Sequence, residues 1–177
     1  MGLRVTGVLL ALLTLSVSAR AQQVTGAWTV RAGYYLGNQF SIGARQGQLE
    51  GLVIGIDAPL VRRIPFAGAL SLSVDVALGG TTRSGEDSDG NIYRFLLTLR
   101  REIGSTPYYA GFGLGYAFTD SRGNQFPDVR RFATQYLLGY RFPVGVQGRL
   151  QPVLEVSFQE GGDNRLNGWM FQAGVRF

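Results

Sequence analysis

The sequence predicts an all-β protein, an eight-stranded antiparallel up-and-down transmembrane β-barrel. Three observations lead to this prediction: eight segments alternate between apolar and small or polar residues, the N-terminus has the pattern of an export signal, and charged residues are few. Charged residues make up 16% of the chain, whereas typical soluble domains contain roughly 25%. Alternation with a period of two indicates strands whose two faces lie in different environments.

The N-terminal residues predict export. Arg4 provides a short positive region, residues 5–17 form an apolar stretch, and Ala19-Arg20-Ala21 fits a small-x-small cleavage site. The apolar stretch is too short for a membrane-spanning helix, so the pattern is typical of a cleaved signal peptide. We therefore expect residues 1–21 to be a signal peptide and residues 22–177 to form one barrel domain.

Four strands are expected in the first half of the mature chain, at residues 27–35, 49–58, 70–78 and 93–100. Each has large apolar residues on one face and smaller or polar residues on the other, because successive side chains of a strand point to opposite faces. The apolar faces are formed in turn by Trp28, Val30, Ala32 and Tyr34; by Leu52, Ile54 and Ile56; by Leu70, Leu72, Val74, Val76 and Leu78; and by Tyr93, Phe95, Leu97 and Leu99.

Four more strands are expected at residues 108–118, 132–142, 151–159 and 169–177. The first of these is the most informative, since aromatic and aliphatic residues share one face while glycines dominate the other. The last alternates strictly and ends on an aromatic residue. Its apolar face is formed by Trp169, Phe171, Ala173, Val175 and Phe177.

The connections alternate in length. Long polar segments are expected at 36–48, 79–91, 119–131 and 160–167, and shorter ones with Pro or Gly at 59–65, 101–107 and 143–149. This alternation is typical of an up-and-down barrel whose two termini lie at the same end. The long loops would then face outward and the short turns would face the periplasm.

The apolar face could point inward, as in a secreted lipocalin-like barrel, or outward into lipid. The abundance of small residues on the opposite face favours a crowded interior. Aromatic residues gather near strand ends, as in the girdles at bilayer interfaces. They are Trp28, Tyr34, Tyr93, Tyr108, Phe118, Tyr140, Phe142, Trp169 and Phe177.

The mature chain resembles the small outer-membrane β-barrel proteins of Gram-negative bacteria typified by the OmpA transmembrane domain. The resemblance rests on the signal peptide, the eight alternating segments, the Tyr108–Tyr116 strand and the closing Phe177. The resemblance implies an outer-membrane location and a final strand that the barrel-assembly machinery reads. Trp169, Phe171, Ala173, Val175 and Phe177 would form that assembly signal. The fold hosts several activities, so the resemblance does not identify one.

A barrel in the outer membrane predicts several partners. Outer-membrane lipid is expected, and Arg130 and Arg131 could meet phosphates of lipopolysaccharide, although solvated loop charges explain them equally well. Nucleic acid is not expected as a partner, and the protein is expected to be a monomer.

The face of each strand opposite the apolar face places small and polar side chains inside the barrel. An eight-stranded barrel is narrow enough for side chains to fill it, so charges there need partners. The expected lumen network consists of Arg31, Asp75, Arg94, Arg141, Glu155, Gln172 and Arg176, with Asp75 and Glu155 as the only inward acids well inside strands. Such a network would either plug the barrel or line a narrow polar path.

An enzyme is not expected. The chain contains no His, Cys or Lys, which excludes His-dependent nucleophile activation, thiolates and Schiff bases. The Asp-rich segment at 86–91 is not a calcium loop, because the position that requires a bidentate Glu is Thr98. We therefore expect no catalytic residues, cofactor or metal.

The first functional hypothesis is a non-enzymatic outer-membrane barrel that serves envelope structure or surface interaction through its outer loops. The alternative is a narrow channel or hydrophobic small-molecule conduit of the OmpW sort, and a second alternative is a secreted lipocalin-like binder.

Overall fold

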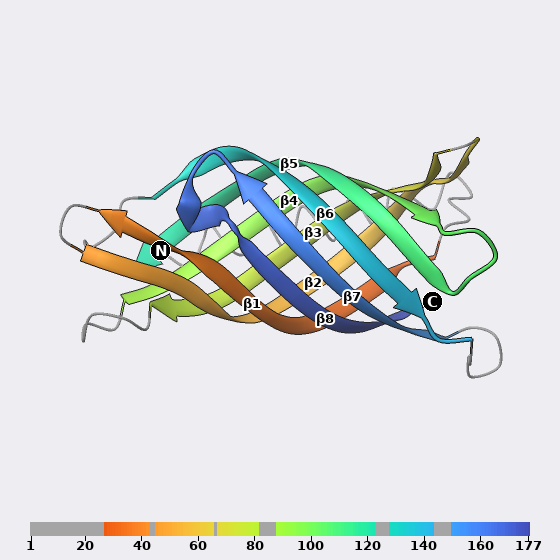
Figure 1. The fold of residues 1–177 in the computed structure, drawn as a ribbon, viewed down its shortest axis with the longest axis horizontal. Helices are drawn as coiled ribbons and strands as arrows, with labels where there is room; N and C mark the ends of the chain where they lie inside the picture. Colours follow the sequence, from red (N-terminus) through yellow and green to blue (C-terminus); the bar gives the residue numbers. More distant parts are fainter. Residues whose placement is uncertain (1–26, 43–44, 66, 82–87, 123–127, 144–149) are drawn as a thin grey trace, which may run out of the picture.

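The barrel is closed. The computed structural model describes residues 27–42, 45–65, 67–81, 88–122, 128–143 and 150–177, and Figure 1 shows eight strands that run side by side around it. The strands are β1 (Thr29–Ile42), β2 (Arg45–Ile64), β3 (Gly68–Thr81), β4 (Ser88–Glu102), β5 (Tyr108–Arg122), β6 (Arg130–Arg141), β7 (Gln151–Gly161) and β8 (Gly168–Arg176). The predicted fold class is confirmed.

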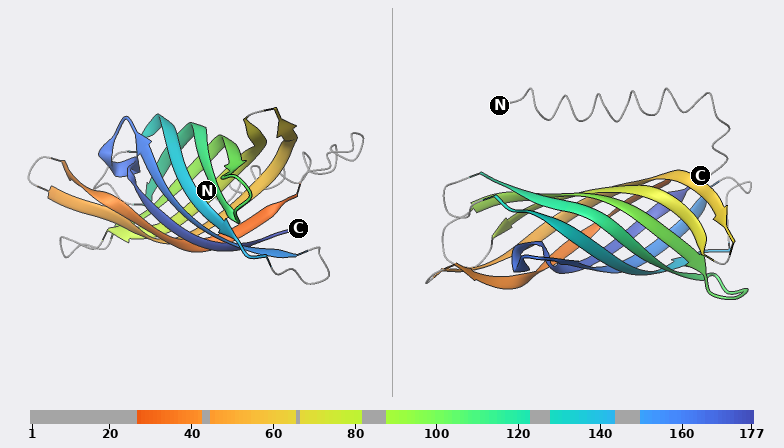
Figure 2. Two further views of the ribbon diagram at one scale, coloured as in Figure 1. Left: turned by 45° about the vertical axis from the view of Figure 1, so that its right-hand side comes forward. Right: turned by 90° about the horizontal axis from the view of Figure 1, so that it is seen from above.

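Each strand pairs with the next in antiparallel fashion, and β8 pairs back with β1. At this closure Thr29 lies opposite Arg176 and Gly37 lies opposite Gly168. The two further views show strands strongly tilted to the barrel axis (Figure 2). No helix in the described ranges is long and apolar enough to cross a membrane.

We call the end where β1 begins and β8 ends the terminus-side end, and the opposite end the loop-side end. In Figure 1 the terminus-side end lies at the right and the loop-side end at the left. A short 3-10 helix, η2 (Asn164–Leu166), lies between β7 and β8 at the loop-side end.

The strands extend well beyond their expected bounds. Residues 36–42 and 45–48 were expected to be loop, but they pair with one another in β1 and β2. The same correction applies to 59–64, 79–81, 88–91 and 119–122, all of which are strand. Most of these stretches contain Gly, Ser or Asn, and 59–64 begins with Pro59; such residues predict turns, yet the backbone ladder continues because its hydrogen bonds do not require particular side chains.

The terminus-side turn between β4 and β5 is short, as the sequence predicted. It spans residues 103–107, and the Ile103 N–H donates to the Tyr108 carbonyl at 3.0 Å. Gly104 has a φ of 61°, in the left-handed region that favours glycine. This residue therefore lets the chain reverse over five residues.

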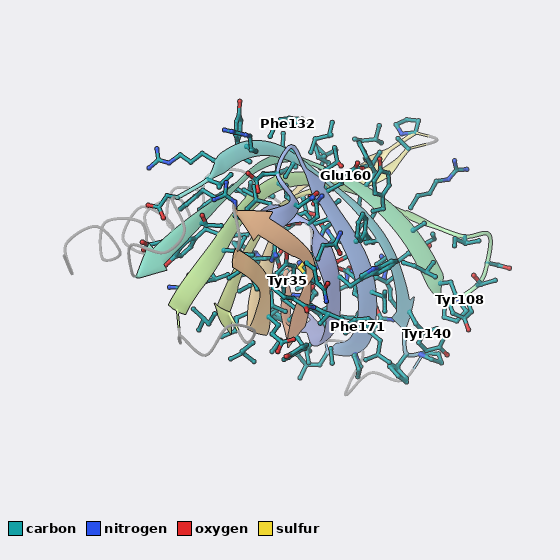
Figure 3. The ribbon with its side chains drawn as sticks, turned by 60° about the vertical axis from the view of Figure 1, so that its left-hand side comes forward. Tyr35, Tyr108, Phe132, Tyr140, Glu160 and Phe171 are labelled. Atoms are coloured by element: carbon teal, nitrogen blue, oxygen red, sulfur yellow. The ribbon has the colours of Figure 1, made fainter. Side chains whose placement is uncertain are left out.

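The outer face is apolar and exposed. Among its residues, Tyr116 is 65% exposed, Leu138 is 54% exposed and Tyr136 is 51% exposed. Figure 3 shows Tyr108, Phe132 and Tyr140 outside the ring of strands, with Tyr35 within it. Aromatic pairs lie near both ends of the outer face, with centroids 5.0 Å apart for Tyr93–Phe118 and for Tyr108–Tyr140.

The interior has two halves. The loop-side half holds an apolar cluster of buried residues: Tyr35, Leu49, Val53, Ala77, Ile92, Leu96, Ala117, Val129, Ala133, Leu166 and Met170. The terminus-side half holds charged side chains, and Arg31 is among the largest fully buried side chains of the protein. The fold thus has a polar group of side chains inside and an apolar surface outside.

Candidate functional site

The charged side chains inside the terminus-side half form one cluster around Arg31. Its Nη2 lies 3.0 Å from Asp57 Oδ1 and 3.3 Å from Asp75 Oδ1, and its Nη1 donates to Glu155 Oε1. Arg31 is 1% exposed. One guanidinium from β1 therefore joins carboxylates from β2, β3 and β7.

A second arginine completes the ion pairs. Arg100 on β4 has its Nη2 3.0 Å from Asp57 Oδ2 and its Nε 3.3 Å from Glu155 Oε2. Its Nη1 donates to Ser71 Oγ at 2.8 Å. Asp57 and Glu155 are thus each shared by two arginines, which is how buried charges are stabilised.

Neutral groups also donate hydrogen bonds to the carboxylates. The Tyr109 hydroxyl donates to Glu155 Oε2 at 3.2 Å, and the Ser73 hydroxyl donates to Asp57 Oδ1 at 2.6 Å. Gln172 Nε2 donates to Asp75 Oδ1 at 3.3 Å. We call these residues the lumen cluster: Arg31, Asp57, Ser73, Asp75, Arg100, Tyr109, Glu155 and Gln172.

Glycines opposite large side chains make room for the lumen cluster. A Cβ on Gly139 would lie 2.1 Å from the Tyr109 ring, and these two residues face each other across β5 and β6. A Cβ on Gly55 would lie 2.1 Å from Asp75 Oδ1. The narrow barrel can therefore hold these side chains because neighbouring inward positions carry none.

The structure brings four of the predicted network residues together: Arg31, Asp75, Glu155 and Gln172. It places Arg94 in the lumen but away from the ion pairs. The Arg94 guanidinium lies 4.4 Å from the Tyr35 ring centroid and donates to Met170 Sδ at 3.2 Å.

The two remaining predicted residues lie at the terminus-side mouth. Arg141 pairs with Glu102, whose side chain is 64% exposed, and stands over the Tyr109 ring at 4.8 Å. It does not enter the lumen cluster. Arg176 ends β8 and lines the same mouth.

The expectation that Asp75 and Glu155 were the only inward acids was wrong, because Asp57 is also buried. The sequence reasoning also left Arg100 and Tyr109 out of the network. The signal for all three was present, since alternation along their strands puts each on the inward face. Their contacts were not visible because register between strands decides which inward residues meet.

The loop-side end of the interior is capped by the β7–β8 connection. Leu166 of η2 is fully buried, and its carbonyl accepts from Gln159 Nε2 at 2.8 Å. The Asn167 carbonyl accepts from the Tyr35 hydroxyl at 3.0 Å. We call residues 162–167 the loop-side cap.

A carboxylate orders the cap. Asp163 accepts from the Arg165 backbone N–H at 3.0 Å, from its Nε at 2.8 Å and from its Nη2 at 2.7 Å. These hydrogen bonds lower the pKa of Asp163 below its ordinary value, against a smaller opposing effect of burial.

The lumen cluster is arranged so that its charges neutralise one another. Arginine side chains contact each of its carboxylates, and the hydroxyls of Tyr109 and Ser73 are used as donors to them. Within the part of the chain that the structure describes, no three His, Cys, Asp or Glu side chains are placed to hold a metal ion.

Solved structures share this architecture. Neisserial surface protein A is 14% identical, with 85% of this chain and 97% of that chain covered at a TM-score of 0.51. The outer membrane protein OprG from Pseudomonas aeruginosa is 13% identical, with 86% and 96% covered at a TM-score of 0.52. No protein-family model and no curated protein matches the sequence. At such identities the similarity shows a common fold, that of the eight-stranded outer-membrane barrels.

Proposed function

We propose that the protein is a non-enzymatic integral outer-membrane barrel with a closed lumen, and that it serves envelope structure or surface interaction through its loop-side end. The observation that carries the proposal is the inverted distribution of polarity. Arg31 and Glu155 are buried inside, while Leu138 and Tyr136 are half-exposed outside. A water-soluble barrel of this kind would expose a continuous apolar belt to water, which a bilayer covers instead.

The lumen is closed because two groups of side chains fill it, one above the other along the barrel axis. The lumen cluster occupies the terminus-side half, and the apolar cluster with the loop-side cap occupies the other half. Because the carboxylates of the lumen cluster contact arginines, they are not available as a general acid or base. This supports a role without catalysis.

The test combines two measurements on protein refolded into detergent and then into planar bilayers. A folded barrel shifts its gel mobility on boiling, and a closed lumen gives no discrete conductance steps. Folding without detergent into a soluble monomer would contradict the membrane proposal and favour the lipocalin-like alternative.

A narrow channel is the second candidate. Several buried polar atoms have no hydrogen-bond partner among the described residues, including Arg94 Nε, Arg94 Nη2 and Asp75 Oδ2. Buried groups of this kind are commonly satisfied by water, which supports a hydrated path through the barrel. Reproducible single-channel steps in wild-type protein, altered in size by Glu155→Gln, would establish this candidate over the closed barrel.

Export and assembly are also proposed. Residues 1–21, which lie outside the described part of the chain, act as a cleaved signal peptide. The outward face of β8, formed by Trp169, Phe171, Ala173, Val175 and Phe177, serves as the assembly signal for the barrel-assembly machinery. N-terminal sequencing of membrane-extracted protein tests the first proposal. Reduced membrane insertion of Phe171→Ser tests the second, with Leu154→Ser, an outward-facing substitution on the neighbouring strand β7, as the control.

The lipid partners are outer-membrane lipid and lipopolysaccharide, and the protein acts as a monomer. Arg130 supports a lipid contact, because it is exposed and stands 5.9 Å from the Phe118 ring centroid near the loop-side end of the outer face. Retention of lipopolysaccharide by wild-type protein and its loss in Arg130→Gln would support this contact. Sedimentation in matched detergent measures the oligomeric state.

A further inference from the structure

A cavity of about 60 Å³ lies at the terminus-side mouth of the barrel. Residues from all eight strands or their ends line it, so it is the entrance to the lumen rather than a groove on the outer face. Its polar lining is formed by Thr29, Asp57, Ser71, Arg100, Tyr109, Arg141 and Arg176. Asp57, Arg100 and Tyr109 belong to the lumen cluster, which forms the floor of the cavity.

The lining is rich in positive charge and in hydrogen-bond donors. Three arginines and one aspartate contribute +3 and −1, so the formal charge of the lining side chains is +2. The Tyr109 hydroxyl donates to Glu155 and the Ser71 hydroxyl donates to the Thr98 carbonyl, so the arginines are the groups that can donate to a ligand. A site with this balance favours an anion, because guanidinium groups supply several fixed N–H donors and carry a permanent charge.

One arginine of the lining, Arg141, retains donor capacity toward the cavity. Arg100 is engaged in the lumen cluster, where its Nη2 lies 3.0 Å from Asp57 Oδ2 and its Nη1 donates to Ser71 Oγ. Arg141 stacks on the Tyr109 ring, and its ion pair is with the exposed Glu102. Exposed ion pairs are weak, so a buried anion can compete for that guanidinium.

We propose that this cavity binds a phosphate-sized oxyanion. A single bound water needs roughly 10–15 Å³, so the cavity has room for several water molecules or for one tetrahedral group of five heavy atoms. Of the three arginines in the lining, Arg141 and Arg176 lie outside the lumen cluster and Arg100 belongs to it. Either free phosphate or the phosphate monoester of a lipid headgroup supplies the required chemistry. The site does not depend on whether the lumen conducts.

Isothermal titration calorimetry of the full mature chain in a zwitterionic detergent tests the proposal. Inorganic phosphate is titrated at constant ionic strength set by chloride, and dihexanoyl phosphatidic acid is titrated in a second series. We expect saturable binding with one ligand per barrel. The double variant Arg141→Gln/Arg176→Gln should weaken binding at least tenfold, while Asp57 and Arg100 remain in place to preserve the fold.

Arg101→Gln is the matched control, because Arg101 is exposed at the same end of the barrel and does not line the cavity. It should bind as wild type does. The heat-induced mobility shift verifies that each variant is folded. If inorganic phosphate binds, a free anion is sufficient as the ligand. If only the lipid binds, the ligand is a headgroup. Either result supports the site when the double variant loses binding of that ligand. Equal weakening by Arg101→Gln, or no saturable binding of either ligand, would overturn the proposal.

Discussion

The two halves of the lumen are held by different interactions, and the loop-side half also contains the buried Arg94, which lies against Tyr35 and Met170. The terminus-side half is held by ion pairs around Arg31 and Arg100, and the loop-side half is held by apolar packing under Leu166. Ion pairs require particular atoms at particular distances, whereas apolar packing requires volume and shape. The two halves should therefore respond differently to substitution even though both close the same barrel.

The difference also lies in how each half depends on strand register. The lumen cluster joins β1, β2, β3, β4, β5, β7 and β8, so a slip of one residue in any of them would turn a polar side chain of the cluster into lipid. The loop-side half includes the cap, which follows β7 directly and contacts it through Gln159. The charged half thus specifies register, and the apolar half adds burial to strands already in register.

The largest expected effect is in the charged half. Glu155→Gln removes the charge that pairs with Arg31 and Arg100, leaving two buried guanidinium groups with fewer counter-charges. We expect a loss of about 3–5 kcal/mol of unfolding free energy. Urea unfolding in lipid vesicles, followed by tryptophan fluorescence, measures the change.

Glu160→Gln is the control for this substitution, because Glu160 lies on the same strand and is exposed. It should change stability by much less. Equal effects of the two variants would show that the ion pairs of the lumen cluster do not stabilise the terminus-side half.

The next largest effect should come from the apolar half. Leu166→Ala leaves a cavity beneath the cap, where Leu166 is fully buried, and should cost about 2–5 kcal/mol. The same unfolding experiment measures it. Leu138→Ala is the control, since Leu138 faces outward and lipid can fill the space; a loss as large as that of Leu166→Ala would contradict the role of the cap.

A smaller effect separates hydrogen bonding from packing in the charged half. Tyr109→Phe keeps the ring that packs on Gly139 but removes the hydroxyl that donates to Glu155. We expect a loss of about 1.5–3 kcal/mol, the range for hydrogen bonds to charged groups. If Tyr109→Phe is combined with Glu155→Gln, the two losses should not add, because the variants remove the same interaction. Simple additivity would count against the bond.

The smallest effect concerns the cap and pH. The pKa of Asp163 is lowered in the folded state, so its contribution to stability is present above the ordinary aspartate pKa and is lost as pH falls through the lowered folded value. Hydrogen exchange of the Arg165 amide should therefore quicken at the acidic end. Asp163→Asn should remove this pH dependence, and an unchanged profile in that variant would assign it to another group.

The fold was predictable because alternation is a local property of the chain. Each strand segment shows it within about ten residues, and the outward Tyr116 and inward Gly115 could be assigned without any knowledge of neighbours. Strand ends were not predictable in the same way. Gly79 and Gly80 favour a turn when read alone, but in the hairpin they face Glu50 and Gly51 across the ladder.

The site was predictable in part. Arg31, Asp75 and Glu155 could be placed in the lumen from their own strands. The partnership of Arg100 with Asp57 could not, because it depends on the relative shift of β2, β3 and β4, which alternation does not determine. Arg94 illustrates the same limit, since it faces Asp75 in register but turns toward Tyr35 and Met170.

The pairing of β1 with β8 has a kinetic consequence. It joins Thr29 to Arg176, nearly the full described length of the chain, so its formation closes the largest possible loop. Loop-closure entropy opposes such contacts until the intervening hairpins have shortened the effective distance. We therefore expect the seam between the first and last strands to form after the seven other pairings, and the folding rate in vesicles to be set by that final step.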